Sequence, residues 1–297
     1  MDTSLKKDPG SGCLPFGRDT SPGSVRLLVA AIRGQTPAGR AESVMAVSRA
    51  LARFLMAGAL LRRPEALASA LAQDVDCLRY GPAVADAVAR WRDAHDIIPE
   101  VERYMAADPF PLLFIVAAAL ETADVPFLLT GSLAGGVYGT PRATNDVDLL
   151  ARLAEASIPT FIGALPPGLY ADPAMIADAA RRRASFNIID PIAGAKVDVF
   201  VSDDSPFARA QFARGRILAL EPSARPLPIV CAEGLVLAKL AWYRAGGEVS
   251  EQQWRDIGGI LVISGPELDR SWLEAWATCL GLRDLLSRIE AEIAGLQ

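Results

Sequence analysis

The sequence predicts a central domain of the α+β or α/β class with helical segments on both sides. Between residues 106 and 230, short apolar runs alternate with turns and helical stretches, as in domains that combine a sheet with helices. Before and after this region, apolar residues recur mainly at helical spacing. With 297 residues and 51% hydrophobic content, the chain is long enough for two packed cores.

The sequence predicts four parts along the chain. Residues 1–23 are rich in glycine and proline and show no apolar period, so we expect a disordered tail. Residues 24–105 are expected to form a separate all-helical domain of unknown role. Residues 106–230 form the domain that contains the sheet, and residues 231–297 form a C-terminal helical lobe.

In the all-helical part, one apolar stripe at helical spacing is expected to face a core. Its members are Val44, Val47, Leu51, Phe54 and Leu55. A further helix is expected to begin at Pro64, and the Gly81-Pro82 pair should break the helical run.

The central domain is expected to begin with a helix over residues 112–122. The strands that follow are short apolar runs bounded by turn residues. They are predicted at residues 127–130, 147–150, 186–189, 197–201 and 217–220.

The composition argues against several kinds of chemistry. The chain holds one histidine, His95, which we expect on the surface or at a helix end. A serine–histidine triad, a histidine-rich zinc site and a histidine acid–base pair are therefore not expected. The formal net charge of −5 gives no strong sign of nucleic-acid binding.

The cysteines and the apolar segments indicate a cytoplasmic protein. The four cysteines lie far apart without C-x-x-C spacing, which is typical of structural thiols in a reduced protein. The N-terminus lacks the apolar core of a secretory signal. No apolar stretch reaches the roughly 18 residues that a membrane span requires, the best being residues 110–120, so no membrane contact is expected.

The first candidate site is a strand-to-helix turn at Gly131 and Ser132. An apolar strand runs into Gly-Ser and then into a helix of small residues, so Ser132 is expected to cap the helix. The free backbone N–H groups of such a turn can hold a phosphate. Gly131 would let the ligand approach the backbone, and the Ser132 hydroxyl would donate to a phosphate oxygen. The alternative is a capped turn with no ligand.

The second candidate is the pair Asp146 and Asp148. Residues two apart in a strand share a face, so these carboxylates project together while Val147 and Leu149 face the core. Adjacent carboxylates repel unless a cation lies between them, and hard oxygen ligands favour Mg²⁺. The alternative is a solvated strand edge.

The third candidate is Asp198. Val197, Val199 and Val201 form one buried face, which leaves Lys196 and Asp198 together on the other. Asp198 could be a solvent-facing acid, with Lys196 as its charge partner. Three aspartates on neighbouring strands, close to a phosphate-binding turn, nevertheless fit a two-metal nucleotidyl-transfer site better than three unrelated acids do.

These residues resemble the signature of the polymerase-β-like nucleotidyltransferase superfamily, which combines Gly131-Ser132, Asp146-x-Asp148 and a separate Asp198. The fuller string is similar to the AbiEii-type branch, through Tyr138-Gly139-x-Pro141-Arg142-x-Thr144-Asn145. The likeness continues with Glu233-x-Leu235-x-Leu237-x-Lys239-Leu240 and Gln253-Trp254-Arg255-Asp256-Ile257. It covers about residues 110–290. It departs at Gly234, where such sequences often carry an acid.

The resemblance implies an α+β fold with a nucleotidyltransferase-type mixed sheet and flanking helices. It implies that Asp146, Asp148 and Asp198 hold two Mg²⁺ ions, with Asp198 completing the ion that activates the attacking hydroxyl or serving as its base. Gly131 and Ser132 would hold the β and γ phosphates of a nucleoside triphosphate. Attack at the α-phosphorus would transfer a nucleoside monophosphate and release pyrophosphate.

Two cations complete the candidate site. Of the 30 basic residues only four are lysines, and Lys196 and Lys239 are the two outside the tail. A lysine retained in an arginine-rich composition indicates a site for a compact ammonium, so we expect Lys239 to contact the triphosphate. The alternative is a solvated helix lysine. Arg142 is expected to contact phosphate or to fix the loop before the Asp146 strand, and Thr144 to have a structural role. The run Arg181-Arg182-Arg183 is expected to be a solvated helix end rather than an acceptor groove.

The resemblance also implies an acceptor and a context. The acceptor would be an RNA, such as a tRNA 3′ end, or a protein hydroxyl, in a toxin–antitoxin or defence system with a cognate partner. Two alternatives stay open. The first is a small-molecule nucleotidyltransferase of the aminoglycoside type. The second is a catalytically silent antitoxin or interaction module in which residues 24–104 form the partner surface.

Overall fold

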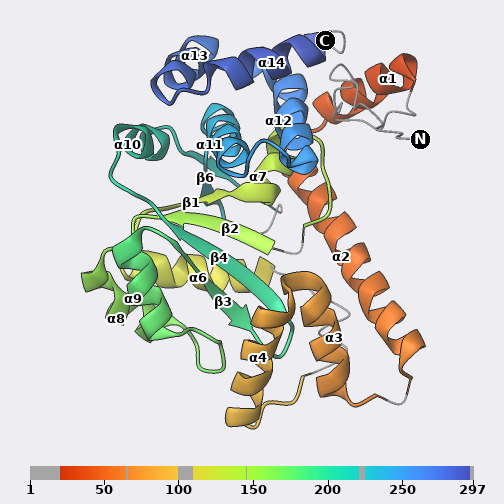
Figure 1. Ribbon diagram of the computed structural model, residues 1–297, viewed down its shortest axis with the longest axis vertical. Helices are drawn as coiled ribbons and strands as arrows, with labels where there is room; N and C mark the ends of the chain where they lie inside the picture. The colour runs from red at the N-terminus through yellow and green to blue at the C-terminus, as the bar shows by residue number, and fades with distance from the viewer. Residues whose placement is uncertain (1–20, 65, 100–109, 145, 221–224, 295–297) are drawn as a thin grey trace, which may run out of the picture. The chain divides into compact units, whose positions relative to one another are not determined.

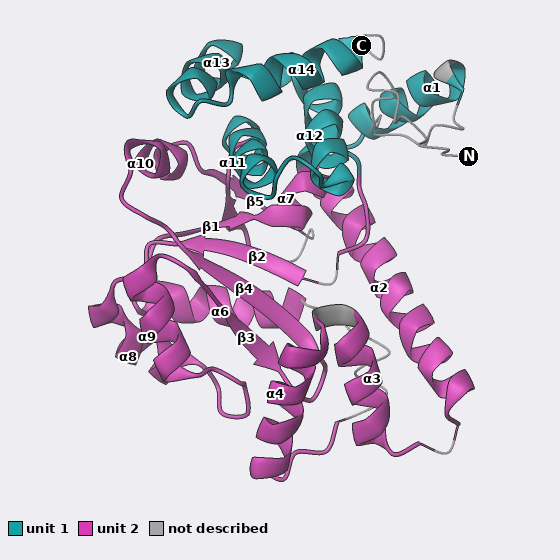
Figure 2. Cartoon of the chain, viewed as in Figure 1, with its two compact units in different colours: residues 1–36, 138–140, 232–297 teal, residues 37–137, 141–231 magenta. Residues whose placement is uncertain are grey.

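The computed structural model describes residues 21–64, 66–99, 110–144, 146–220 and 225–294. The chain packs as two compact units (Figure 2). Unit 1 comprises residues 1–36, 138–140 and 232–297, and unit 2 comprises residues 37–137 and 141–231. The predicted division at residues 23, 105 and 230 stays a prediction. Most of the predicted tail lies outside the described residues, and the first helix already begins at Pro22, with Ser21 as its cap.

Within the described residues, unit 2 is built around a six-stranded mixed sheet, which confirms the predicted α+β fold. The strand order is β3-β4-β2-β1-β6-β5; β2 pairs with β4 and β1 with β6 in parallel, and the other neighbours are antiparallel (Figure 1). The strands are β1 Phe127–Thr130, β2 Asp146–Ala151, β3 Ser185–Asp190, β4 Ala195–Val201, β5 Arg216–Leu218 and β6 Leu227–Ile229.

The predicted strands agree with the structure except at the end of the sheet. The runs at 127–130, 147–150, 186–189 and 197–201 all lie inside observed strands. The run predicted at 217–220 is shorter and begins one residue earlier, as β5, and β6 was not predicted at all. The centre of β6 is Pro228, and a proline normally argues against a strand because it has no N–H to donate.

Helices of unit 2 pack on this sheet and on one another. Among them, α6 contacts β3 and β4 as well as α8, and α9 contacts β3. The helices are α2 Pro37–Arg62, α3 Ala68–Tyr80, α4 Pro82–Ala94, α6 Phe110–Thr122, α7 Gly131–Tyr138, α8 Ile158–Ala164, α9 Pro173–Arg182 and α10 Pro206–Ala213, with the short 3-10 helix Glu155–Ser157.

Helix α2 buries only part of the predicted stripe, since Val44 is fully buried as expected but other members are not. Val47, Leu51 and Phe54 are exposed, Phe54 to 76%. The buried side chains are Arg40, Ala41, Val44, Met45, Ser48, Ala52, Met56 and Ala59. The small members of this face allow a close approach to α7, where a Cβ added at Gly136 would overlap Val44 Cγ2. Close helix packing therefore outweighed side-chain size in selecting the buried face.

The same helix bears on the expectation about membrane spans, within the described residues. By length and composition alone α2 is apolar enough to cross a membrane, and 33% of its most apolar window is buried. In the structure the buried Arg40 side chain donates from Nε to the carbonyl of Val137, so a polar group of α2 serves packing inside unit 2.

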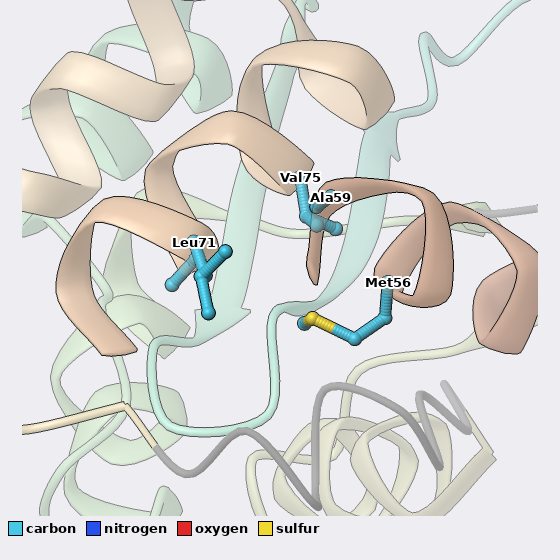
Figure 3. Packing of buried hydrophobic residues seen from close by; sticks show 5 residues of the cluster. Met56, Ala59, Leu71 and Val75 are labelled. Atoms are coloured by element: carbon cyan, nitrogen blue, oxygen red, sulfur yellow. The ribbon is translucent and has the colours of Figure 1, made fainter. Parts of the chain in front are cut away.

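Within unit 2, helix α3 packs against α2, and α4 packs against α3. Met56 and Ala59 of α2 pack against Leu71 and Val75 of α3 (Figure 3). Helix α3 begins at Ala68 and not at Pro64 as predicted, whereas the break before Pro82 is confirmed.

A buried ion pair fixes α3 and α4 to the β3–β4 turn. Arg92 of α4 lies 2.6 Å from Asp76 of α3, and its Nε donates to the carbonyl of Pro191 at 2.8 Å. Because both partners are almost fully buried, the loss of either one would leave an uncompensated charge. The pair therefore joins the helices of the N-terminal half to the sheet.

Unit 1 is helical in its described residues. Its helices are α1 Pro22–Arg33, α11 Ala232–Ala245, α12 Glu251–Ile263, α13 Arg270–Cys279 and α14 Arg283–Ile293, with the short 3-10 helix Gly265–Glu267. Helix α1 contacts α12, where Arg33 Nη2 donates to the carbonyl of Val262 at 2.6 Å. Ser264 Oγ donates to the carbonyl of Tyr138 at 2.6 Å, which fixes the short segment 138–140 to this unit.

Candidate functional site

A row of polar side chains crosses the central strands of the sheet. Asp148 of β2 lies opposite Asp198 of β4, and it also lies opposite Thr130 of β1 on its other side. Asn187 of β3 lies opposite Asp198. Residues opposite one another across a sheet project from the same face, so these four side chains form one row. Between them along the strands, Val147, Leu149, Val197 and Val199 are fully buried on the other face, as predicted.

The sequence analysis missed two members of this row, Thr130 and Asn187. Thr130 is the last residue of β1, and Asn187 is a polar residue inside an otherwise apolar run. The presence of a polar residue within this apolar run could have indicated a position on the site face. Its meaning depends on the pairing of β3 with β4, which the sequence does not reveal.

A second row, one step along the same face, contains Asp146 and Lys196. These residues lie opposite each other in the parallel pair of β2 and β4. Lys196 Nζ lies 2.8 Å from Asp198 Oδ2 and 3.5 Å from Asp146 Oδ1, so one ammonium contacts carboxylates of two strands. The interpretation of Lys196 as a charge partner of Asp198 is confirmed. Asp198 is not a solvated surface acid, since its side chain is only 16% exposed.

The turn at Gly131 lies directly against Asp148. The backbone N–H of Ser132 donates to Asp148 Oδ2 at 3.3 Å. Gly131 has φ +64°, and a Cβ there would lie 2.6 Å from Asp148 Cβ and still closer to its carboxylate. Only glycine fits this close approach. The structure thus brings the predicted phosphate turn and the second carboxylate of the Asp146–Asp148 pair together.

The structure corrects the predicted position of Ser132. Helix α7 begins at Gly131, so Ser132 lies in its first turn and not at the N-cap. The positive φ of Gly131 lets the chain change from strand to helix at this residue, one residue earlier than predicted. The Ser132 hydroxyl accepts a hydrogen bond from Arg142 Nη2 at 2.8 Å. Arg142 therefore lies beside the turn, and it also donates from Nη1 to the carbonyl of Ala143.

Thr144 has the structural role that was expected. Its hydroxyl donates to the carbonyl of Asp146 at 2.9 Å, and its backbone N–H donates to Ser48 Oγ of α2 at 2.9 Å. Both Ser48 and Thr144 are buried. Asn145, the remaining residue of this motif, lies outside the described residues. The loop that delivers Asp146 to the site is thus fixed by a helix from the N-terminal half of the chain.

We expect Ser48→Ala to lower the free energy of unfolding by about 1–3 kcal/mol, because the buried N–H of Thr144 then loses its acceptor. Ser43→Ala is the matched control, since Ser43 and Ser48 both donate to a carbonyl one turn back in α2, at Gly39 and Val44. Urea denaturation of both variants measures the difference. Equal losses would show that the Thr144 contact contributes nothing.

The carboxyl group of Asp148 is electrostatically unusual. Burial is the main cause that raises its pKa to about 6, and the negative charge of Asp198 adds to this effect. The hydrogen bond from the Ser132 N–H lowers this pKa, and Lys196 lowers it slightly. Burial alone would lower the pKa of Lys196, but the charges of Asp146 and Asp198 raise it above its ordinary value. Asp148 is thus a carboxylate held in a place that disfavours negative charge, which is common at functional sites.

Whether the carboxylates fit a divalent cation can be tested on their geometry. Among the described residues, no three metal-ligating side chains lie close enough together to hold an ion. The ammonium of Lys196 lies between two of the three aspartates instead. Their oxygens are nevertheless the hard ligands that Mg²⁺ prefers, and Asp198 Oδ1 is buried with no hydrogen-bond partner among the residues that the structure describes. The ligand chemistry of the three aspartates therefore fits Mg²⁺, but the ammonium of Lys196 occupies the position between Asp146 and Asp198.

Lys239 is buried in unit 1, which contradicts the alternative of a solvated helix lysine. Its Nζ, on α11, lies 2.9 Å from Asp256 and donates to Gln253 at 3.0 Å, both on α12. Residues of these two motif blocks, which lie apart in the sequence, thus form one hydrogen-bonded cluster. A contact of Lys239 with a triphosphate stays a prediction.

The remaining candidates have the structural roles that were expected. Arg181 and Arg182 are exposed at the end of α9 and pair with Asp178, and Arg183 caps the helix with φ +55°. His95 follows α4 and stacks on Trp91, with ring centroids 4.1 Å apart. Neither the arginine run nor the histidine belongs to the carboxylate site.

Comparison with known proteins yields only distant similarity. No model of a protein family matches the chain, and no curated protein sequence matches it. One similar solved structure is the antibiotic-resistance factor ANT(2'')-Ia, with 14% identity, a TM-score of 0.37, and coverage of 62% of this chain and 94% of that chain. Another is an antigenic nucleotidyltransferase-like protein from Paracoccidioides brasiliensis, with 18% identity, a TM-score of 0.33, and coverage of 60% of this chain and 90% of that chain. Similarities this low assign no activity to the chain.

Proposed function

We propose that this chain is a Mg²⁺-dependent nucleotidyltransferase that transfers a nucleoside monophosphate from a nucleoside triphosphate to a hydroxyl group. The observation that carries the proposal is the arrangement around Asp148. Its carboxylate lies opposite Asp198 in a parallel strand pair and accepts the backbone N–H of Ser132 at the start of α7. A carboxylate pair beside a helix N-terminus combines a cation site with an anion site, which is what a metal-bound triphosphate requires.

Asp146, Asp148 and Asp198 are the residues that would hold the cation. Their carboxylates share one face of the sheet, and Asp198 Oδ1 has no hydrogen-bond partner within the described residues. Bound Mg²⁺ would neutralise charge on the phosphates and hold them in line for displacement.

The turn and the loop beside it would hold the phosphates. Gly131 has no side chain, which lets the turn lie directly against Asp148, and the remaining N–H groups at the start of α7 would donate to a phosphate held beside that carboxylate. Arg142 Nη2, which donates to Ser132 Oγ, lies where its guanidinium can exchange this partner for a phosphate oxygen. Lys239 is a further proposed phosphate contact, which requires its ammonium to exchange Asp256 for phosphate.

In the transfer step, the acceptor oxygen forms a bond to the α-phosphorus while the bond to pyrophosphate breaks. The acceptor proton passes to Asp198, whose carboxylate lies in the same row as Asp148. No histidine is required, which agrees with a chain whose single histidine lies at the end of α4. Positioning and charge neutralisation supply most of the rate in such reactions.

For the acceptor we propose an RNA such as a tRNA, or a protein hydroxyl, in a toxin–antitoxin or defence system with a cognate partner. This part follows from the resemblance of the motifs. The exposed face of α2, which includes Val47 and Phe54, is available to such a partner. A small-molecule acceptor and a silent interaction module are distinguished by the experiment below.

The test incubates the purified protein with Mg²⁺ and each nucleoside triphosphate labelled at the α-phosphate. Separate reactions supply total tRNA, cell-extract protein or aminoglycosides. We expect label in the tRNA or protein fraction and release of pyrophosphate. Asp146→Asn and Asp198→Asn should reduce this transfer at least about a hundredfold, because each removes a cation ligand.

Asp178→Asn is the matched control, since it removes an exposed carboxylate of the same unit that pairs only with arginines at a helix end. It should retain the activity of the parent protein. Label in aminoglycosides alone would replace the proposed acceptor with a small molecule. Absence of transfer to every acceptor, or full transfer by folded Asp146→Asn and Asp198→Asn, would contradict the proposal.

A further inference from the structure

The ammonium of Lys196 lies where a divalent cation would contact the carboxylates. It is 2.8 Å from Asp198 Oδ2 and 3.5 Å from Asp146 Oδ1, and the lysine side chain is only 11% exposed. Lys196 also belongs to the strand register itself, directly opposite Asp146. This contact is therefore built into the sheet, unlike that of a flexible surface side chain.

The charges around Lys196 explain why a cation is needed there. Asp146, Asp148 and Asp198 project from one face, and Asp148 lies opposite Asp198. Carboxylates so close together repel one another strongly when they are partly removed from water. A compact ammonium can lie between two carboxylates from adjacent strands, whereas the planar guanidinium of arginine is larger and prefers to lie against one of them. Lysine at this position is thus notable in a chain whose basic residues are mostly arginine.

We propose that Lys196 is an internal counter-cation that competes with the divalent cation for Asp146 and Asp198. In the metal-free protein its ammonium holds the two carboxylates together. Asp146 and Asp198 would hold the metal ion through the same oxygens that contact the ammonium, so the ammonium must leave them before the ion can bind. Lys196 therefore sets the cation concentration at which the site fills. This inference rests on the proposed function, since it concerns the cation which that function requires.

The first experiment measures binding of Mn²⁺ alone, without nucleotide, from the electron paramagnetic resonance signal of the free ion. We compare the parent protein with Lys196→Met, which has similar length and no charge. Removing one positive charge that contacts the ligands should tighten Mn²⁺ binding about tenfold or more. Arg270→Met is the matched control, because it removes one positive charge from an ion pair outside the carboxylate site, that with Glu290. Its Mn²⁺ affinity should equal that of the parent.

A second measurement uses the parent protein, in case Lys196→Met does not fold. The chain has only four lysines, so selective ¹³C labelling of the lysine ε-carbons gives few NMR signals. Lys→Arg variants assign these signals. Adding Mg²⁺ should move the Lys196 signal as its ammonium leaves the carboxylates, while the Lys239 signal should stay in place.

The outcomes separate this inference from the proposed function. Equal Mn²⁺ affinity of the parent and folded Lys196→Met, or an unchanged Lys196 signal at saturating Mg²⁺, would overturn the counter-cation role and leave the transferase proposal standing. Mn²⁺ binding by Lys196→Met but not by the parent would give the strongest support for the counter-cation role. Absence of cation binding in both proteins would overturn both proposals.

Discussion

Replacing Gly131 with alanine is expected to destabilise unit 2 and to abolish the proposed nucleotidyl transfer. Gly131 has φ +64°, which costs an alanine about 1–2 kcal/mol. The added Cβ would also lie 2.6 Å from Asp148 Cβ and closer still to the carboxylate. Relieving this overlap costs about 1–3 kcal/mol more, and it must move either β2 or the turn. The side chain displaced is Asp148, so the cation site and the phosphate turn are lost together.

Gly281→Ala isolates the backbone part of this effect. Gly281 has a nearly identical φ of +67°, but a Cβ there meets nothing within 4 Å. We expect Gly281→Ala to lower the free energy of unfolding only by the penalty of the left-handed backbone conformation, and to retain the activity of the parent. Urea denaturation together with label transfer measures both effects. If the two variants lose equal stability and both remain active, the contact between Gly131 and Asp148 is not what requires glycine.

Much of the candidate site could be predicted from the sequence because its motifs are local. The alternation around Asp148 and Asp198 assigned each carboxylate to the polar face of its strand, and the structure confirms this assignment. What the sequence could not provide was the register. Asp148 lies opposite Asp198 only because β2 and β4 pair in parallel with one particular alignment. A shift by one residue would have turned one carboxylate into the core.

The errors in the fold prediction come from contacts between segments far apart in the chain. The apolar stripe of α2 was read from side-chain hydrophobicity, which favours Leu51 and Phe54. The helix instead buries Ser48, which accepts the N–H of Thr144, and small residues that let it approach Gly136 of α7. Strand β6 was missed because Pro228 argues against a strand when only the local sequence is considered. Both errors arise where tertiary packing outweighs local propensity.

Asp148→Asn is expected to make the metal-free protein more stable above pH 7 while abolishing the proposed nucleotidyl transfer. The pKa of Asp148 is raised to about 6 from its ordinary value of 3.8, mainly by burial and then by Asp198. The folded state therefore binds the Asp148 proton more readily than the unfolded state does. The resulting stability is fully present below about pH 4 and is lost as the pH rises through about 6. At pH 7.5 the ionised carboxylate thus costs up to about 3 kcal/mol, a cost that the uncharged asparagine avoids.

The measurement is urea denaturation of both proteins from pH 4 to pH 8 in the presence of a chelator. The free energy of unfolding of Asp148→Asn relative to the parent should be close to zero near pH 4 and should rise to a plateau above pH 7. A flat difference for Asp148→Asn would contradict the raised pKa. Saturating Mg²⁺ should raise the free energy of unfolding of the parent more than that of Asp148→Asn, because only the parent has all three proposed carboxylate ligands. The Asp148 carboxylate lowers the stability of the metal-free fold, and a bound cation should remove this cost. Such a residue is expected where selection acts on binding and not on stability.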